Sequence, residues 1–342
     1  MRLISFILIS LTLLTACGEQ AAQTTKIYAF GTEIDVSIYG EDEATFERTI
    51  SQLEMTFSGV NDLWHAWQPS VLTRINDAIA DGDSIAIDDN VATVIKQARQ
   101  LAHDSEHLFN PAAGRLFTLW GYEQDDWFES RPPPARSDIE AWLAANPTMD
   151  DLVIDNGRLS SRNNMVKLGF GGFAKGYAVD AAIEVLKAEN IDNAIINIGG
   201  DLRAIGQHGK RLWNIGIRHP RQDGVLASVT VKDDESVFSS GDYERYFEYQ
   251  GKRYSHIMDP RTGYPADEAI SVTVIDDNAA RADAAATALF VAGSDWPQLA
   301  AKLGLRHVMM MNQDGVLEMS PAMAERVKLI SYQDEPVLRD IR

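Results

Sequence analysis

The chain has 342 residues, of which 45% are hydrophobic and 24% charged, a composition typical of a soluble globular protein with a large core. Asp and Glu number 50 against 31 Lys and Arg, which gives a formal net charge of −19. This acidity argues against nucleic-acid binding, because a polyphosphate backbone needs a basic surface. Cys17 is the only cysteine, so an internal disulfide bond is excluded.

The N-terminal residues are typical of an export signal. Arg2 precedes the apolar run 3–14, which is too short for a comfortable membrane span and ends in Leu14-Thr15-Ala16-Cys17. The sequence Leu-x-Ala-Cys is similar to a bacterial lipobox, in which Cys17 is lipidated and becomes the mature N-terminus. A plain cleaved signal peptide and an uncleaved anchor are the alternatives. We expect an exported, membrane-anchored lipoprotein that faces the periplasm. Its expected divisions are a signal peptide over 1–16, lipidated Cys17 with a polar tether over 17–25, and a folded domain over 26–342.

Hydrophobic spacing and turn residues predict the elements of the first half. Strands are expected at 26–29 and 33–39, and helices over 44–60 and 90–102. Ser137-Asp138-Ile139-Glu140 has the spacing of a capping box and predicts a helix start. Asn156-Gly157 predicts a hairpin turn between strands at 152–155 and 158–161.

The second half begins with a strand-like segment, 165–170, that runs through two glycines directly into a helix-like segment, 174–189. Further strands are expected at 194–198, at several places in 212–256 with a turn at Gln250-Gly251, and on both sides of Gln313-Asp314-Gly315. Hairpins with a few helices favour an α+β fold, with mixed, largely antiparallel sheets and packed helices, over a doubly wound sheet.

The glycine pair at Gly171 and Gly172 is the first candidate site. Glycines allow a tight turn and close approach of backbone to a ligand. The following helix offers free N–H groups and the positive end of its dipole, with Lys175 in the first turn, and this combination suits a phosphate group. An ordinary turn without a ligand is the alternative.

Asp283 and Thr287 form the second candidate site. They lie one helical turn apart, so a carboxylate and a hydroxyl face the same way, among alanines that leave room for another backbone. Such hard oxygen ligands suit Mg²⁺. The alternative is a helix packed through small residues, with Asp283 near an N-cap.

Three blocks resemble the signatures of the ApbE family, the FAD:protein FMN transferases. They are GGFAKGYAVD from Gly171, HIMDPRTGYP from His256 and ADAAATALFVAG from Ala282. Weaker matches lie at 30–32, 70–76 and 110–122, so the resemblance follows the family's order over nearly the whole mature chain. It implies an ApbE-like fold.

The resemblance also implies a catalytic constellation. Mg²⁺ would be held by the side chains of Asp283 and Thr287 and by the backbone carbonyls of Gly172 and Ala286. His256 would act with Asp283 in catalysis, taking a proton from the attacking hydroxyl. A histidine that is merely hydrogen-bonded to Asp259 is the alternative.

The resemblance implies that FAD contacts several blocks, and some of these contact positions differ from the residue usual in the family. Phe30 stands where Met is usual, and Trp67 lies near a usual Tyr. Asn110 and Gly169 each stand where many relatives carry an acid, so an acidic contact there is replaced. The implied set is Phe30, Trp67, Asn110, Pro111, Ala112, Gly169, Lys175 and Met258.

The implied activity is Mg²⁺-dependent transfer of FMN from FAD to a Thr or Ser hydroxyl of an exported flavoprotein, with release of AMP. The implied recipients are flavin-carrying subunits of membrane redox complexes. No acceptor sequence of the form Asp-Gly-x-Ser/Thr-Gly-Ala-Ser/Thr occurs in the chain, which favours a modifying enzyme over a modified protein. The alternatives are an FAD pyrophosphatase that uses water, a flavin-binding lipoprotein without turnover, and a scaffold lipoprotein.

Overall fold

The structure is a computed structural model that describes residues 22–232 and 234–341. The predicted signal peptide and Cys17 lie outside the described residues. The first strand begins at Gln23, so three residues expected in the tether belong to the folded part. Among the described residues, no helix is long and apolar enough to cross a membrane.

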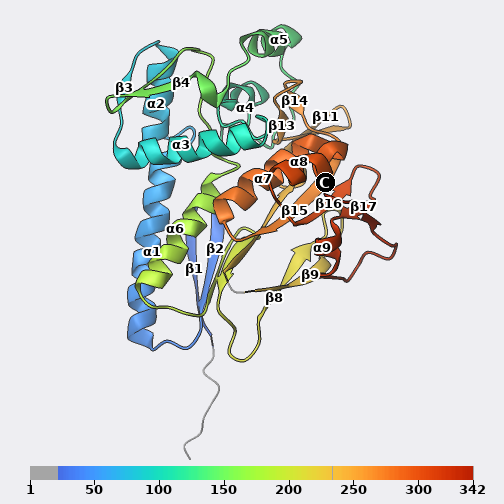
Figure 1. The fold of residues 1–342 in the computed structure, drawn as a ribbon. Helices are drawn as coiled ribbons and strands as arrows, with labels where there is room; N and C mark the ends of the chain where they lie inside the picture. Colours follow the sequence, from blue (N-terminus) through green and yellow to red (C-terminus); the bar gives the residue numbers. More distant parts are fainter. Residues whose placement is uncertain (1–21, 233, 342) are drawn as a thin grey trace, which may run out of the picture.

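The described residues form a central sheet of nine strands in the order β1-β2-β6-β7-β10-β15-β16-β17-β19 (Figure 1). Neighbouring strands are antiparallel except β17 and β19, which are parallel. The strands are β1 (Gln23–Ala29), β2 (Thr32–Ile38), β6 (Ala194–Ile198), β7 (Asp201–Ile205), β10 (Glu235–Gly241), β15 (Ala269–Asp276), β16 (His307–Asn312), β17 (Leu317–Met319) and β19 (Val337–Leu338).

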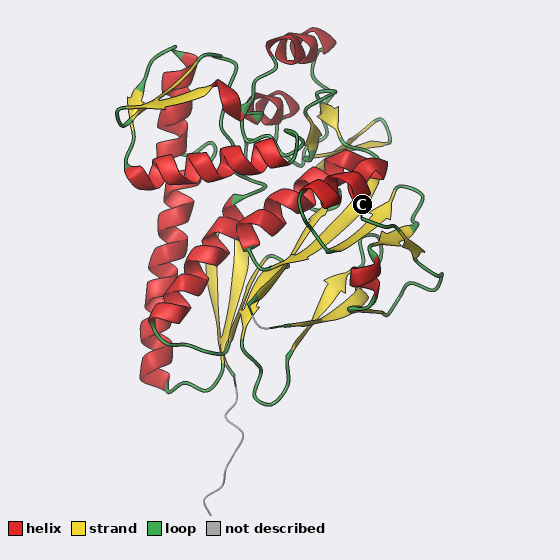
Figure 2. Ribbon diagram, viewed as in Figure 1, coloured by secondary structure: helices red, strands yellow, loops and turns green. Residues whose placement is uncertain are grey.

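Each face of this sheet covers a different core. Because side chains alternate along a strand, Phe238 of β10 joins the core beneath the helices, whereas Val237 joins the core on the other face. The helical layer contains α1 (Glu43–Trp64), α6 (Ala174–Ala188) and α7 (Ala279–Ala292). The opposite face packs against a smaller sheet in the order β18-β9-β8, made of β8 (Trp213–Arg218), β9 (Val225–Val231) and β18 (Val327–Leu329) (Figure 2).

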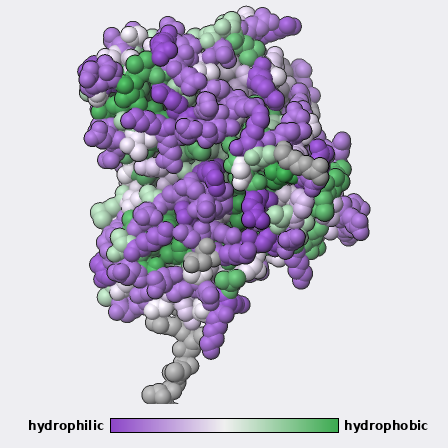
Figure 3. Space-filling model, viewed as in Figure 1, coloured by the Kyte–Doolittle hydropathy of each residue, from purple (hydrophilic) through white to green (hydrophobic). Residues whose placement is uncertain are grey.

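The remaining elements lie mainly at one end of the helical layer (Figure 1). A third core there joins the short helices α4 and α5 to the hairpin β11-β12 through Trp120, Trp142 and Phe247. These elements and the other short ones are α2 (Val71–Ala80), β3 (Ile85–Ala86), α3 (Asp89–Asp104), α4 (Gly114–Trp120), α5 (Arg136–Ala145), β4 (Leu152–Asp155), β5 (Arg158–Ser161), β11 (Tyr246–Tyr249), β12 (Lys252–Ser255), β13 (Met258–Asp259), β14 (Tyr264–Pro265), α8 (Trp296–Lys302) and α9 (Pro321–Ala324). The outer surface in view is mostly hydrophilic, with scattered apolar patches (Figure 3).

The α+β prediction is confirmed, and most predicted elements are present. Two local expectations are wrong. Residues 165–170 form no strand; they lie beside the 110–114 segment, with one isolated bridge between Ala113 and Lys167. Helix α5 begins at Arg136 after Ala135, without a side-chain cap, so Ser137 is not its N-cap.

Helices α6 and α7 approach each other at Gly176. A Cβ at this position would lie 2.3 Å from the backbone oxygen of Ala279 and 2.7 Å from Cα of Ala280. Backbone atoms cannot move aside as a flexible side chain does. The absence of a side chain at Gly176 is therefore what lets the two helices pack this closely.

Gly176→Ala should destabilise the protein by about 1–3 kcal/mol, because overpacking against backbone outweighs the better helix propensity of alanine. Gly171→Ala is the matched control, since a Cβ there would meet nothing within 4 Å. Chemical denaturation of both variants measures the difference. Equal stability of Gly176→Ala and wild type would show that the helix contact is looser than the structure indicates.

Candidate active site

Lys175 lies in the first turn of α6 and links the charged groups of the candidate site. Its ammonium group forms an ion pair with Asp201, which begins β7 directly after Gly199 and Gly200. The second carboxylate oxygen of Asp201 accepts the N–H of Ser239 at 2.7 Å. Strand β7 therefore fixes the direction of the lysine side chain.

The charge of Lys175 is maintained by its neighbours. Burial by itself would lower the pKa of Lys175, but the carboxylates of Asp201, Asp283 and Glu244 raise it to a net value above the usual range. The lysine is therefore cationic at physiological pH. A permanent positive charge at a helix N-terminus suits an anionic phosphate.

Asp283 is buried, with 5% of its surface exposed, and projects from α7 toward the start of α6. Its Oδ2 atom accepts the N–H of Gly176 at 2.9 Å, the one side-chain hydrogen bond that it makes among the described residues. Burial raises the pKa of Asp283 to about 7, although the nearby charge of Lys175 opposes the rise. A buried carboxylate with so few donors is poorly compensated unless a cation or a proton binds it.

Thr287 and Gly172 complete the oxygen-rich side of the site. The Thr287 Oγ1 atom lies 3.3 Å from the backbone oxygen of Asp283 and 3.3 Å from Oγ of Ser240. A Cβ on Gly172 would lie 2.9 Å from this same Oγ1 atom, so only glycine brings the backbone so near. The predicted ligands Gly172, Asp283 and Thr287 are thus brought to one place, and Ala286 lies beside Thr287 in the same helix.

This donor set fits magnesium chemically, because each expected ligand is a hard oxygen atom and few come from side chains. No cluster of three or more His, Cys, Asp or Glu side chains suited to a metal ion occurs within the described residues. The expected site uses a single carboxylate, so such a cluster is not part of it. Magnesium at this place stays a prediction.

His256 follows β12 and is held by the backbone of Arg245. Its N–H donates to the Arg245 carbonyl oxygen at 3.0 Å, and its Nδ1 atom lies 3.2 Å from the same oxygen. A carbonyl only accepts, so Nδ1 carries the proton and Nε2 keeps its lone pair. Burial, then the positive charges of Arg245 and Lys175, lower the pKa of His256 to about 3, so the imidazole is neutral.

The alternative partner for His256, Asp259, is otherwise engaged. Its carboxylate is paired with the guanidinium of Arg261, with Oδ1 2.9 Å from Nε and Oδ2 2.9 Å from Nη2. His256 is therefore free of a carboxylate partner among the described residues. Its unprotonated Nε2 can accept a proton.

The expected FAD-contact segment 110–112 lies beside 167–169. Gly169 donates its N–H to the Pro111 carbonyl at 2.8 Å, and Lys167 donates to the Ala112 carbonyl at 3.3 Å. The side chain of Asn110 accepts the Ala112 N–H at 3.0 Å and donates to the Pro147 carbonyl at 2.9 Å. Asn110 thus shapes its own loop, and the segment leads into the glycine pair before α6.

The three other positions expected to contact FAD, Phe30, Trp67 and Met258, have different surroundings. Phe30 has φ 55° in the turn between β1 and β2, where its N–H donates to Oδ1 of Asn61 at 3.1 Å. Trp67 follows α1, and its Nε1–H donates to Asp125 at 3.3 Å. The side chain of Met258 is buried in the third core.

Sequence reasoning missed the role of Asp201. It noted Gly199-Gly200-Asp201 only as a place of close backbone approach, whereas the structure pairs the carboxylate with Lys175 across 26 residues. An aspartate directly after two glycines was the available signal. Its partner could not be named without the fold.

The chain is similar in sequence to proteins named FAD:protein FMN transferase. A FAD:protein FMN transferase of Rhodobacter capsulatus is 40% identical over 93% of this chain, which spans 60% of that relative's length. A FAD:protein FMN transferase of Haemophilus influenzae is 32% identical, with 75% of this chain and 76% of the relative covered.

Two solved structures share the fold. The ApbE protein of Thermotoga maritima superposes with a TM-score of 0.81 and 31% identity, covering 89% of this chain and 99% of that one. The flavinyl transferase ApbE of Pseudomonas stutzeri, in its apo form, has a TM-score of 0.79 and 29% identity, covering 91% and 98%. The class that the fold and these relatives define is that of the flavin transferases.

The ApbE family model matches residues 30–309. The chain belongs to the ApbE family, and the resemblance inferred from its three blocks is confirmed.

Proposed function

We propose that this chain is an Mg²⁺-dependent FAD:protein FMN transferase that moves FMN from FAD to a Thr or Ser hydroxyl of an exported flavoprotein and releases AMP. The observation that carries the proposal is the grouping of Lys175 and Asp283 at the start of α6, with His256 near enough for the charge of Lys175 to lower its pKa. The positive charge of Lys175 favours the ionised form of Asp283 and adds to burial and Arg245 in favouring the neutral form of His256.

The proposed reaction exchanges one P–O bond for another. The acceptor hydroxyl oxygen bonds to the phosphorus on the FMN side of the pyrophosphate, the bridging P–O bond breaks, and AMP leaves with the bridging oxygen. Nε2 of His256 takes the hydroxyl proton. Lys175, at the positive end of the α6 dipole, holds the phosphates. Mg²⁺, held by Asp283, Thr287, Gly172 and Ala286, supplies charge stabilisation for the phosphoryl oxygens when bound.

The place of action is proposed from the sequence alone. The N-terminal signal and Cys17 support an exported lipoprotein anchored in a membrane and facing the periplasm. Flavin-carrying subunits of membrane redox complexes are the proposed acceptors, because such an anchor keeps the enzyme near them. Globomycin treatment of expressing cells should leave an unprocessed precursor, and unchanged processing would remove the lipoprotein assignment.

The test of the function uses the purified chain, FAD and Mg²⁺, with and without a flavoprotein domain carrying Asp-Gly-x-Ser/Thr-Gly-Ala-Ser/Thr. We expect the acceptor to gain the mass of one FMN less one water on a single hydroxyl residue, with AMP formed in equal amount. Free FMN appearing at the same rate in both mixtures would identify a pyrophosphatase instead. FAD binding without any product would identify a flavin-binding protein.

A further inference from the structure

Helices α6 and α7 each cap the first turn of the other. Asp283 of α7 accepts the N–H of Gly176 in α6 at 2.9 Å. In the opposite direction, Asp180 of α6 accepts the N–H groups of Ala279 and Ala280 at 2.9 and 3.0 Å, one with each carboxylate oxygen. Carboxylates at helix N-termini satisfy otherwise unpaired donors and interact favourably with the helix dipole. The two aspartates thus join the helices on both sides of their contact.

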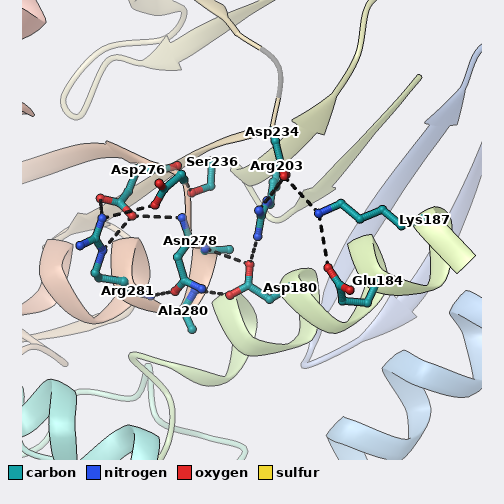
Figure 4. A network of polar contacts seen from close by, with 12 residues as sticks. Asp180, Glu184, Lys187, Arg203, Asp234, Ser236, Asp276, Asn278, Ala280 and Arg281 are labelled. Atoms are coloured by element: carbon teal, nitrogen blue, oxygen red, sulfur yellow. Dashed lines mark hydrogen bonds and ion pairs between the residues drawn. The ribbon is translucent and has the colours of Figure 1, made fainter. Parts of the chain in front are cut away.

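Asp180 is in turn held by Arg203 of β7. Nη1 of Arg203 pairs with Oδ1 of Asp180, and Nε and Nη2 donate to Oδ1 of Asp234 at 3.0 and 2.7 Å (Figure 4). Arg203 is 8% exposed, so the fork is fixed in one direction. Asp180 therefore accepts three hydrogen bonds from two other elements, two from α7 and one from β7.

This linkage determines the geometry of the proposed cation site. Gly172 lies just before α6, whereas Asp283 and Thr287 lie on α7. The separation between these ligands is set by the register of one helix against the other. Magnesium requires a near-ideal arrangement of its oxygen ligands, so a small slip between the helices weakens binding.

We propose that Asp180, oriented by Arg203, is a positioning residue that sets the register of α7 against α6 and so assembles the divalent-cation site. This inference rests on the proposed function, because it takes Asp283 and Thr287 as cation ligands. It adds a residue that contacts neither the cation nor the nucleotide.

The test measures Mn²⁺ binding to purified Asp180→Asn by electron paramagnetic resonance, since Mn²⁺ takes the same hard oxygen ligands as Mg²⁺. Asparagine keeps the shape of the side chain but lacks the negative charge with which Arg203 and the N-terminus of α7 both interact. We expect Mn²⁺ affinity to fall by about 10-fold or more, as when outer partners of metal ligands are removed. FAD affinity in the absence of metal, from flavin fluorescence, should be unchanged.

Two controls separate positioning from general destabilisation. Asn278→Ala removes the N-cap that α7 supplies for itself, in which Oδ1 of Asn278 accepts the Arg281 N–H at 2.7 Å. It should lower the melting temperature and leave Mn²⁺ affinity unchanged, because the link to α6 remains. Glu184→Gln removes an exposed carboxylate one turn beyond Asp180 on α6 and should change neither.

Arg203→Lys provides a second variant, because an ammonium cannot hold Asp180 and Asp234 with one planar fork. It should also weaken Mn²⁺ binding, by less than Asp180→Asn. Wild-type affinity in both folded variants would overturn the positioning role of Asp180. Absence of Mn²⁺ binding to the wild-type protein would instead overturn the cation site itself, and the inference with it.

Discussion

Asp283→Asn is expected to lose FMN transfer almost completely while the protein remains folded. The amide can still accept the Gly176 N–H, but it brings no negative charge to a cation. We expect kcat to fall by about a thousandfold, the scale seen when a key electrostatic group is removed from an active site. The measurement is acceptor flavinylation under saturating FAD and Mg²⁺.

The same variant should change how stability depends on pH in metal-free protein. Burial raises the folded-state pKa of Asp283 to about 7, above the ordinary value of about 3.9. Its stabilising contribution is therefore fully present below about pH 4 and is lost as pH rises through about 7. Between pH 5 and 8, the melting temperature of wild type in EDTA should fall more steeply than that of Asp283→Asn. Adding Mg²⁺ at pH 8 should raise the midpoint of wild type alone.

Asp277→Asn is the matched control for both measurements. It makes the same chemical change at an exposed aspartate just before α7 and should behave as wild type. If Asp283→Asn kept its activity and its response to Mg²⁺, the cation would have to bind elsewhere.

Sequence reasoning was accurate where a few neighbouring residues determine the backbone. The hairpin turns at Asn156-Gly157 and Gln250-Gly251 have φ of 49° and 71° and of 51° and 76°. Two successive positive φ angles are what a tight hairpin requires and what Asn and Gly favour. The turn residues alone therefore placed these strands.

Sequence reasoning failed where the hydrogen bonds of a segment come from a side chain that is distant in the sequence. The segment 165–170 has apolar residues like a strand, but Leu168 donates its N–H to Oδ1 of Asn76 at 2.6 Å and accepts from Nδ2 of the same residue at 2.9 Å. A buried asparagine thus replaces the neighbouring strand. No local pattern signals this substitution.

The same distinction between local and distant residues applies to the candidate site. Gly172 and Lys175 belong to one short stretch, and helical spacing relates Asp283 to Thr287, so these residues were predicted from the sequence. Asp180 and Arg203 lie 23 residues apart on a helix and a strand. Only the packing of that helix on the sheet brings them together, so their pairing was not predictable.

His256→Gln is expected to lower kcat by about 10²- to 10⁴-fold, the usual contribution of a general base, while FAD affinity is retained. The loss should appear in flavinylation of the acceptor with FAD saturating. His103→Gln, at an exposed histidine of α3, is the matched control and should leave the rate unchanged.

The pH profile makes this prediction sharper. Because the pKa of His256 is lowered to about 3, the imidazole is already the free base throughout the range from pH 5 to 9. With Mg²⁺ saturating, so that Asp283 stays ionised, the rate of wild type should therefore show no acidic limb near pH 6.5, where an ordinary histidine gains its proton. A limb at that pH that vanished in His256→Gln would show that the imidazole titrates normally, and that the burial and positive charges around it do not control its basicity.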